Sequence, residues 1–101
     1  MGKKNLTIED IRKVLALHRD ALEAQYGVLE LGLFGSMVRG EADEKSDIDI
    51  LVSFSKNIDY FDFLDLEESL EKLLGMPVDL VERRALKPYI GERILNEMVI
   101  L

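Results

Sequence analysis

The sequence contains no cysteine among its 101 residues. Disulfide bonds, zinc sites built from thiolates and cysteine nucleophiles are therefore all excluded. The single histidine, His18, falls in an expected helix and has no second histidine to share a metal ion with, so we interpret it as structural. The chemistry of this chain must come from other polar side chains.

Basic residues are scarce, because 13 Lys and Arg stand against 20 Asp and Glu, for a formal net charge of -7. Nonspecific nucleic-acid binding depends on neutralising phosphates with Lys and Arg, so we expect no direct nucleic-acid binding. No apolar run approaches the roughly 20 residues of a membrane-spanning helix. The first residues lead into the charged run 9–13 rather than the apolar stretch of a signal peptide. We therefore expect a cytoplasmic protein with no membrane partner.

Length and apolar content predict one domain over residues 1–101, since 48% hydrophobic residues in a chain of this size can fill one core but not two. Apolar spacing and turn residues then predict the elements. The expected helices follow Thr7 to about Tyr26, cover 37–40, follow Asp59 as far as Gly75 and begin again at Pro88; the expected strands are 28–34, 47–54, 78–81 and, more weakly, 98–101, with a loop at 41–46.

This order predicts an α/β (α+β) fold in which helices flank a small mixed β-sheet. One expected helix, the segment after Asp59, is apolar on more than one side. It could provide core contacts together with a partner surface, but we interpret it as core alone. The residues concerned are Phe61, Phe63, Leu64 and Leu66.

The expected strand 47–54 carries two aspartates, Asp47 and Asp49, on the face opposite its isoleucines. Residues two apart on a strand point to the same side, so these carboxylates can converge on one metal ion. Magnesium prefers oxygen ligands and usually takes one or two carboxylates from the protein, with water and phosphates completing its shell. Asp79 alternates with apolar residues on the next strand and can face the same site. The alternative is that Asp47 and Asp49 form the solvent face of an edge strand.

A glycine–serine step, Gly35-Ser36, ends the expected strand 28–34. Glycine allows the backbone to approach a ligand closely, and the amides that open the following helix can bind an anion. The Ser36 hydroxyl can add a contact to phosphate. Such a cradle facing two carboxylates is typical of a site for a metal-bound nucleoside triphosphate. Arg39, one helical turn further on, can contact the same phosphates or pair with the acidic residues 41–44.

Two other motifs are excluded. Gly35 and Gly40 have the spacing of a P-loop, but Glu41 stands where that motif requires lysine. The segment from Asp47 begins like a calcium-binding loop, but Leu51 and Val52 replace a ligand and the required glycine.

The segments 35–40 and 46–52, with ten residues between Ser36 and Asp47, resemble the signature of the DNA polymerase β-type nucleotidyltransferases. Nearly the whole chain, including residues 75–81, is similar to the minimal nucleotidyltransferases, which are the antitoxin partners of HEPN ribonuclease toxins. The resemblance implies that Asp47, Asp49 and Asp79 bind magnesium, with two ions expected, and that Gly35 and Ser36 bind the triphosphate of ATP. It also implies that the product is a HEPN toxin carrying AMP on a tyrosine.

Three functions remain open at this point. The chain can transfer AMP to a hydroxyl of a partner toxin, with Asp79 either assisting deprotonation of the acceptor or completing metal ligation. It can instead neutralise the toxin by binding alone. A third possibility is transfer to a small molecule or a nucleic acid, but relatives of that kind carry additional domains to hold the acceptor. We favour the first function because a protein that only masks its partner does not need three aspartates beside Gly35 and Ser36.

Overall fold

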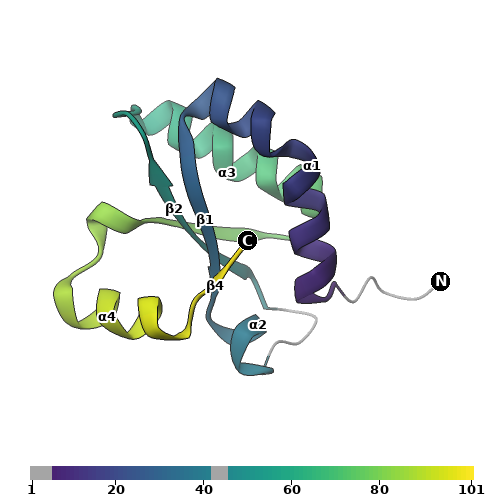
Figure 1. Ribbon diagram of the computed structural model, residues 1–101, viewed down its shortest axis with the longest axis vertical. Helices are drawn as coiled ribbons and strands as arrows, with labels where there is room; N and C mark the ends of the chain where they lie inside the picture. Colours follow the sequence, from purple (N-terminus) through teal and green to yellow (C-terminus); the bar gives the residue numbers. More distant parts are fainter. Residues whose placement is uncertain (1–5, 42–45) are drawn as a thin grey trace.

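The computed structural model describes residues 6–41 and 46–101. Its elements, in chain order, are α1 (Ile8–Tyr26), β1 (Val28–Phe34), α2 (Ser36–Arg39), β2 (Ile48–Phe54), α3 (Tyr60–Leu74), β3 (Val78–Glu82), the 3-10 helix η1 (Arg83–Ala85), α4 (Pro88–Glu97) and β4 (Val99–Ile100) (Figure 1). In the part of the chain described here, no helix is both long and apolar enough to cross a membrane.

The predicted order of elements is confirmed, with boundaries that differ by a residue or so. Strand β2 begins at Ile48, so Asp47 directly precedes it rather than opening it. The turn η1 was not predicted, because three residues are too few to show a period. Most of the expected loop, residues 42–45, lies outside the described residues.

Local sequence explains where the two long helices begin and end. Thr7 and Asp10 form a reciprocal capping box at the start of α1, each side chain bonding to the backbone amide of the other. Asp59 caps α3 by accepting a hydrogen bond from the Asp62 amide. Gly27 and Gly75 end these helices in the left-handed conformation.

The four strands form one mixed sheet in the order β3-β2-β1-β4. Strands β1 and β2 are antiparallel, β2 and β3 are parallel, and β4 adds a short antiparallel pair to β1. The mixed sheet flanked by helices that the sequence predicts is therefore confirmed. Strand β2 lies inside the sheet, so the alternative that Asp49 decorates an edge strand is wrong.

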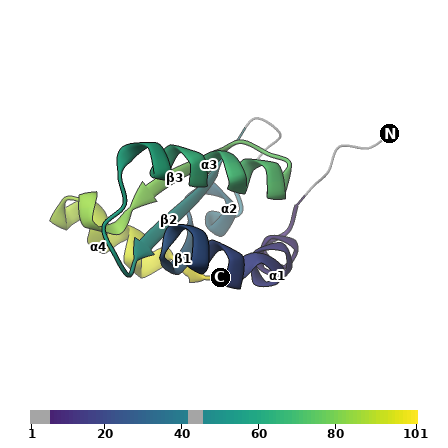
Figure 2. The same cartoon turned by 90° about the horizontal axis from the view of Figure 1, so that it is seen from above.

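Helices α1 and α3 lie side by side over one face of the sheet, with α4 on the other side of the molecule (Figure 2). The face beneath α1 and α3 holds the core. Strand β2 supplies to it the residues predicted from alternation, Ile48, Ile50, Val52 and Phe54. Residues on the opposite face of the strands, Asp49 and Asp79 among them, point toward the α4 side.

The interpretation of α3 as purely core-facing is wrong at its start. Phe61 is 79% exposed and Leu64 is 39% exposed. The buried stripe of α3 runs through Leu66, Leu70 and Leu74, which recur every four residues and so face the sheet together. Phe61 lies five residues before this stripe begins, which turns its side chain toward solvent. The apolar start of α3 is therefore a surface feature.

Tyr26, the last residue of α1, ties this helix to α3. Its ring is buried, and its hydroxyl donates a 2.6 Å hydrogen bond to Oδ2 of Asp65. The hydroxyl is also 3.0 Å from Oγ of Ser69. Burial, followed by the hydrogen bond to Asp65, raises the pKa of Tyr26 above its ordinary value. The neutral phenol is thus favoured in the folded state.

We predict that Tyr26→Phe lowers the free energy of unfolding by about 1–2 kcal/mol, because two polar side chains on α3 lose their partner. Because the pKa of Tyr26 is raised in the folded state, its hydroxyl contributes fully to the free energy of unfolding below about pH 10. This contribution is lost as the pH rises through the folded-state pKa. Urea unfolding of wild type and variant at pH 8 and pH 11 measures this. Tyr89→Phe is the matched control, since Tyr89 is 85% exposed. An equal loss in both variants would contradict the assignment.

Candidate functional site

The sheet brings two of the predicted carboxylates directly together. Asp49 of β2 and Asp79 of β3 are register partners in the parallel pair, and both occupy the face away from α1 and α3. Asp47 precedes Asp49 by two residues and is exposed. The prediction that Asp79 lies on a strand beside β2 and shares the face of Asp49 is confirmed. Three carboxylates therefore gather where β2 and β3 begin.

Asp49 lies in an unfavourable electrostatic environment for a carboxylate. Its pKa is raised, first because burial disfavours the charged form, and then because the negative charges of Asp79 and Asp47 lie nearby. The positive charge of Arg39 acts in the opposite direction. The charge of Arg39 does not offset burial and the like charges around this half-buried carboxylate, and a metal ion bound here would add further positive charge.

Gly35 lies against the Asp49 carboxylate. The last residue of β1, Phe34, is the register partner of Asp49, so the chain turns out of the sheet beside it. Gly35 turns with φ 78° and ψ −148°, a conformation nearly restricted to glycine. A Cβ atom at this position would overlap Oδ2 of Asp49. The predicted phosphate-binding step and the predicted metal ligand are thus in contact.

Ser36 and Arg39 begin and end α2, the single turn that follows Gly35. Ser36 is half-buried. Arg39 donates from Nε to Oε1 of Glu41 at 2.8 Å, so of the two alternatives for Arg39 the structure shows the pairing with the acidic segment, at Glu41. The remainder of that segment lies outside the described residues. Glu41 therefore binds the Nε side of the guanidinium and leaves its Nη1 atom available for another partner.

The Nη1 side of the Arg39 guanidinium contacts Glu97, the last residue of α4. The sequence did not predict this contact. Nη1 of Arg39 is 3.2 Å from Oε1 of Glu97. The same oxygen accepts a 3.1 Å hydrogen bond from the Gly35 amide. Glu97 lies 58 residues from Arg39 and belongs to no motif, so only the folded chain reveals this contact.

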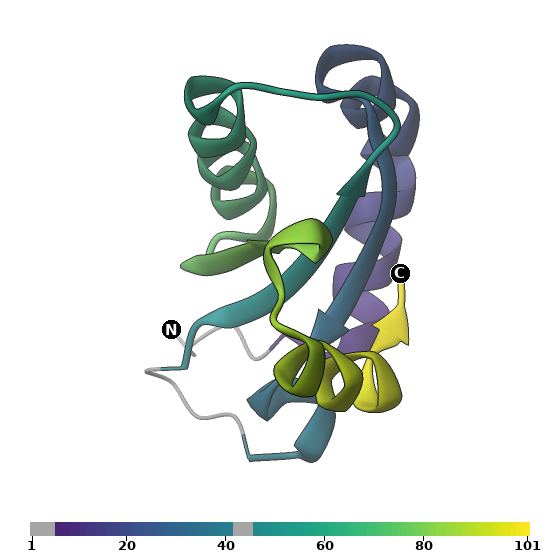
Figure 3. The same ribbon diagram turned by 90° about the vertical axis from the view of Figure 1, so that its left-hand side faces the viewer.

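An open cavity of about 470 Å³ lies between the sheet and α4, and Ser36, Asp47 and Asp79 are not among the residues that line it. Helices α2 and α4 lie together at this end of the sheet (Figure 3). The lining residues are Phe34, Gly35, Arg39, Asp49, Ile90, Arg93, Ile94, Asn96 and Glu97. Of the residues predicted from sequence, the cavity therefore collects Gly35, Arg39 and Asp49.

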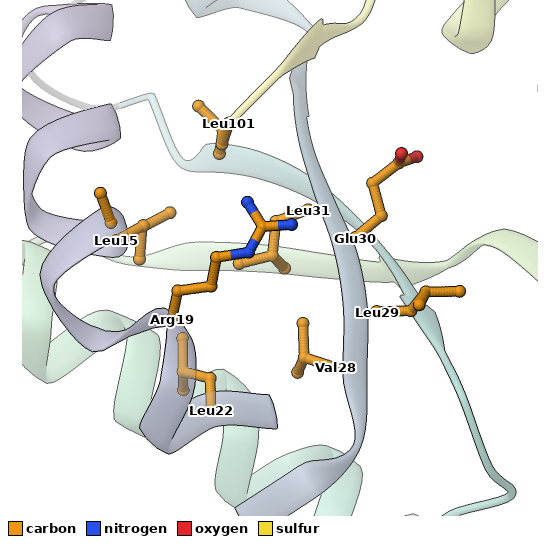
Figure 4. Close-up of a pocket in the computed structure, with 9 residues that line it drawn as sticks. Leu15, Arg19, Leu22, Val28, Leu29, Glu30, Leu31 and Leu101 are labelled. Atoms are coloured by element: carbon orange, nitrogen blue, oxygen red, sulfur yellow. The ribbon is translucent and has the colours of Figure 1, made fainter. Parts of the chain in front are cut away.

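A second hollow, between α1 and β1, is a poorer candidate. It measures about 50 Å³ and is mostly apolar, with Arg19 and Glu30 the charged residues that line it (Figure 4). Pockets that bind ligands typically measure about 300–1,000 Å³, so this hollow is too small for a nucleotide. It also contains none of the residues that the sequence singled out.

The carboxylates supply the oxygen ligands that magnesium prefers, although their side chains are not yet gathered around one point. Among residues 6–41 and 46–101, no three His, Cys, Asp or Glu side chains are arranged to hold one metal ion together. The negative charges of Asp79 and Asp47 raise the pKa of Asp49, so a bound cation would lower the electrostatic cost of holding these carboxylates close together. The backbone places Asp49 beside Asp79 as register partners on neighbouring strands.

A mixed sheet with carboxylates facing a glycine–serine turn defines a class of nucleotide-processing enzymes. Residues 15–101 match the family model described as "Nucleotidyltransferase domain". The chain belongs to this family, and the predicted enzyme class, a nucleotidyltransferase, is confirmed.

Two individual relatives narrow the class further. The chain is 49% identical to the protein adenylyltransferase MntA of Thermococcus cleftensis over 94 residues, which are 93% of this chain and 95% of that one. It is 37% identical to a solved structure assigned as a minimal nucleotidyltransferase, with a TM-score of 0.79, over 98% of this chain and 100% of that one. The resemblance to minimal nucleotidyltransferases is thereby confirmed.

A third relative was solved with a nucleotide analogue. It is described as a toxin-antitoxin with AMP-PNP and is 26% identical, with a TM-score of 0.72. The match covers 90% of this chain and 71% of that one.

Gly35→Ala should weaken magnesium-dependent ATP binding, because the new methyl group displaces the Asp49 carboxylate. It should also lower the free energy of unfolding by about 1–3 kcal/mol, from backbone strain. Gly75→Ala is the matched control: Gly75 has a similar φ of 70°, but no atom lies within 4 Å of the position that its Cβ would take. Calorimetric titration with ATP and magnesium should show lost affinity for the first variant only. Equal affinity in the two folded variants would contradict the proposed contact.

Asp49→Asn should raise the melting temperature of the metal-free protein. The raised pKa of Asp49 shows that the folded state disfavours its charged form, and asparagine removes that charge. Magnesium should then stabilise the wild type more than the variant, since a ligand stabilises the state that binds it. Scanning calorimetry with EDTA and with magnesium tests both statements. A lower melting temperature for the metal-free variant would argue against charge repulsion at this site.

Proposed function

We propose that this chain is an antitoxin that transfers AMP from ATP to a hydroxyl group, that of a tyrosine, on a HEPN ribonuclease toxin. The observation that carries the proposal is the position of Asp49, which pairs with Asp79 in the sheet, lies against Gly35, and is close enough to Asp47, Asp79 and Arg39 for their charges to act on its pKa. Two relatives support the assignment, since one is named a protein adenylyltransferase and another is described as a toxin-antitoxin with AMP-PNP.

In this proposal the three carboxylates have different roles at the metal site. Asp47 and Asp49 hold magnesium, and Asp79 either completes the ligation or accepts the proton of the attacking hydroxyl. Bound to these aspartates, magnesium, with two ions expected, would neutralise negative charge on the triphosphate and on the pyrophosphate leaving group. The raised pKa of Asp49 supports its role, because a cation relieves the crowding of negative charge that raises it.

The groups beside the carboxylates bind the phosphates. Gly35 brings backbone close to the Asp49 carboxylate, which places a phosphate held at Gly35 near the metal ligands. Ser36 contributes its hydroxyl. Arg39 presents Nη1 toward the cavity while Glu41 fixes its Nε, so the guanidinium is oriented before a nucleotide arrives.

The acceptor in this proposal is a protein. The relative from Thermococcus cleftensis is named for protein adenylylation, and the chain covers 95% of its length. The cavity is open toward solvent beside α4, where Tyr89 and Ile90 are exposed. A macromolecule that approaches from this side can insert a hydroxyl beside the carboxylates.

We predict that the wild type, incubated with its toxin, ATP and magnesium, raises the toxin's mass by multiples of roughly 329 Da, the mass of an added AMP unit. The double variant Asp47→Asn with Asp49→Asn should reduce the rate by on the order of 100-fold or more, since metal affinity depends on both ligands. Intact-mass spectrometry measures the product. Asp20→Asn is the control, because Asp20 is an exposed aspartate on α1.

The same variants distinguish transfer from masking. Ribonuclease activity of the toxin should persist when the double variant replaces the wild type, even in excess. If the folded double variant neutralises the toxin as well as the wild type does, the catalytic account of neutralisation is wrong and binding alone suffices. Modification of the toxin at a residue other than tyrosine would refute only the named acceptor.

A further inference from the structure

Glu97 occupies the hydrogen-bond donors that the proposed function assigns to phosphate. Its Oε1 accepts from the Gly35 amide at 3.1 Å and from Nη1 of Arg39 at 3.2 Å. Its Oε2 lies 3.5 Å from the same Nη1. A backbone amide and a guanidinium converging on one anionic oxygen make the arrangement that binds a phosphate oxygen. The carboxylate therefore imitates a phosphate group of the nucleotide.

We propose that Glu97 competes with the nucleotide's phosphates for Gly35 and Arg39, so that ATP binds only when the Glu97 side chain withdraws. This inference rests on the proposed function, because it needs the triphosphate to use these two donors. Glu97 thereby sets the affinity for ATP and makes nucleotide binding sensitive to the position of α4. A partner that moves the end of α4 can then raise or lower that affinity.

Charge makes simultaneous occupancy unfavourable. Asp49 and Glu97 both line the cavity, and Arg39 and Arg93 are the cations that line it with them. A triphosphate adds several negative charges to this balance. While Glu97 accepts hydrogen bonds from Gly35 and Arg39, its negative charge repels a phosphate that approaches these two donors. With Glu97 withdrawn, Arg39 and Arg93 face the nucleotide, and Glu41 still orients Arg39.

Withdrawal of Glu97 is feasible with little disturbance of the core. Its side chain is 30% exposed, so it has a route to solvent. Gly91 is the one buried residue of α4. The helix therefore makes few buried contacts with the rest of the molecule. Beyond Glu97 the chain is fixed again, because the Met98 side chain lies over Gly32 and β4 pairs with β1. The end of α4 is thus a lightly held segment next to an anchored one.

The test compares ATP affinity in wild type, Glu97→Gln, Glu97→Ala and the control Glu92→Gln, by calorimetric titration with ATP and magnesium. Glu92 lies on the same helix, is exposed, and lines a different hollow. We expect Glu97→Gln to bind about two- to fivefold more tightly than wild type, the range that partly exposed ion pairs contribute. Glu97→Ala should bind at least as tightly as Glu97→Gln, and Glu92→Gln should match wild type.

Unchanged or weaker binding in folded Glu97→Gln overturns the inference and makes Glu97 a brace between α4 and α2. Glutamine keeps an acceptor oxygen for Gly35 and Arg39 but removes the negative charge. Glu97→Gln therefore distinguishes the effect of the charge from that of the structural contact, even if Glu97→Ala does not fold. Failure of the wild type to bind ATP at all would instead refute the proposed function itself.

A second measurement follows the contact directly. The amide resonance of Gly35 in ¹H–¹⁵N spectra should shift when ATP and magnesium are added to the wild type, because its hydrogen-bond acceptor changes from carboxylate to phosphate. The metal-free Glu97→Gln protein should already show a shifted Gly35 resonance. A Gly35 resonance that stays at its nucleotide-free position in a saturated complex would show that ATP binds without displacing Glu97, which overturns the inference.

Discussion

The site depends on one constraint, the placement of Asp49 and Asp79 as neighbours on two parallel strands. Parallel pairing requires a crossover, which α3 provides over the apolar face, and this leaves the opposite face of both strands for polar residues. Like charges on adjacent strands cost stability. The fold tolerates that cost because the strands that carry these aspartates are held from behind by a continuous apolar core.

Gly35 extends this constraint from the sheet to the phosphate-binding turn. Because Phe34 pairs with Asp49, the chain leaves β1 beside the carboxylates, and no side chain larger than hydrogen fits there. The proposed phosphate-binding turn and the strand that carries the proposed metal ligand Asp49 are therefore fixed relative to each other by backbone packing. A metal-bound triphosphate needs both at once, so this contact determines the spacing of the two halves of the site.

The sequence predicted those parts of the structure that follow from periodicity and local chemistry. Alternation along β2 identified both its buried face and the two aspartates, and the glycine step marked the turn. What it missed depends on contacts between distant segments: the phase of α3, which turns Phe61 outward, and the meeting of Glu97 with Arg39. A glutamate at the end of a helix carries no local signal, because its role is set by where α4 crosses the sheet.

The negative net charge of the chain explains why the contact between Glu97 and Arg39 matters for nucleotide binding. A protein of net charge -7 that binds an anionic nucleotide cannot rely on its overall field, so affinity must come from metal ions and a few local donors. Where donors are few, a carboxylate that engages two of them has a large influence on whether the site is available. In the proposals above, Asp49 and Glu97 have opposite effects on nucleotide binding. Asp49 favours it through a bound cation, and Glu97 opposes it by accepting hydrogen bonds from Gly35 and Arg39. On this proposal, a movement of α4 changes the nucleotide affinity while the carboxylate pair Asp49 and Asp79 stays in place in the sheet.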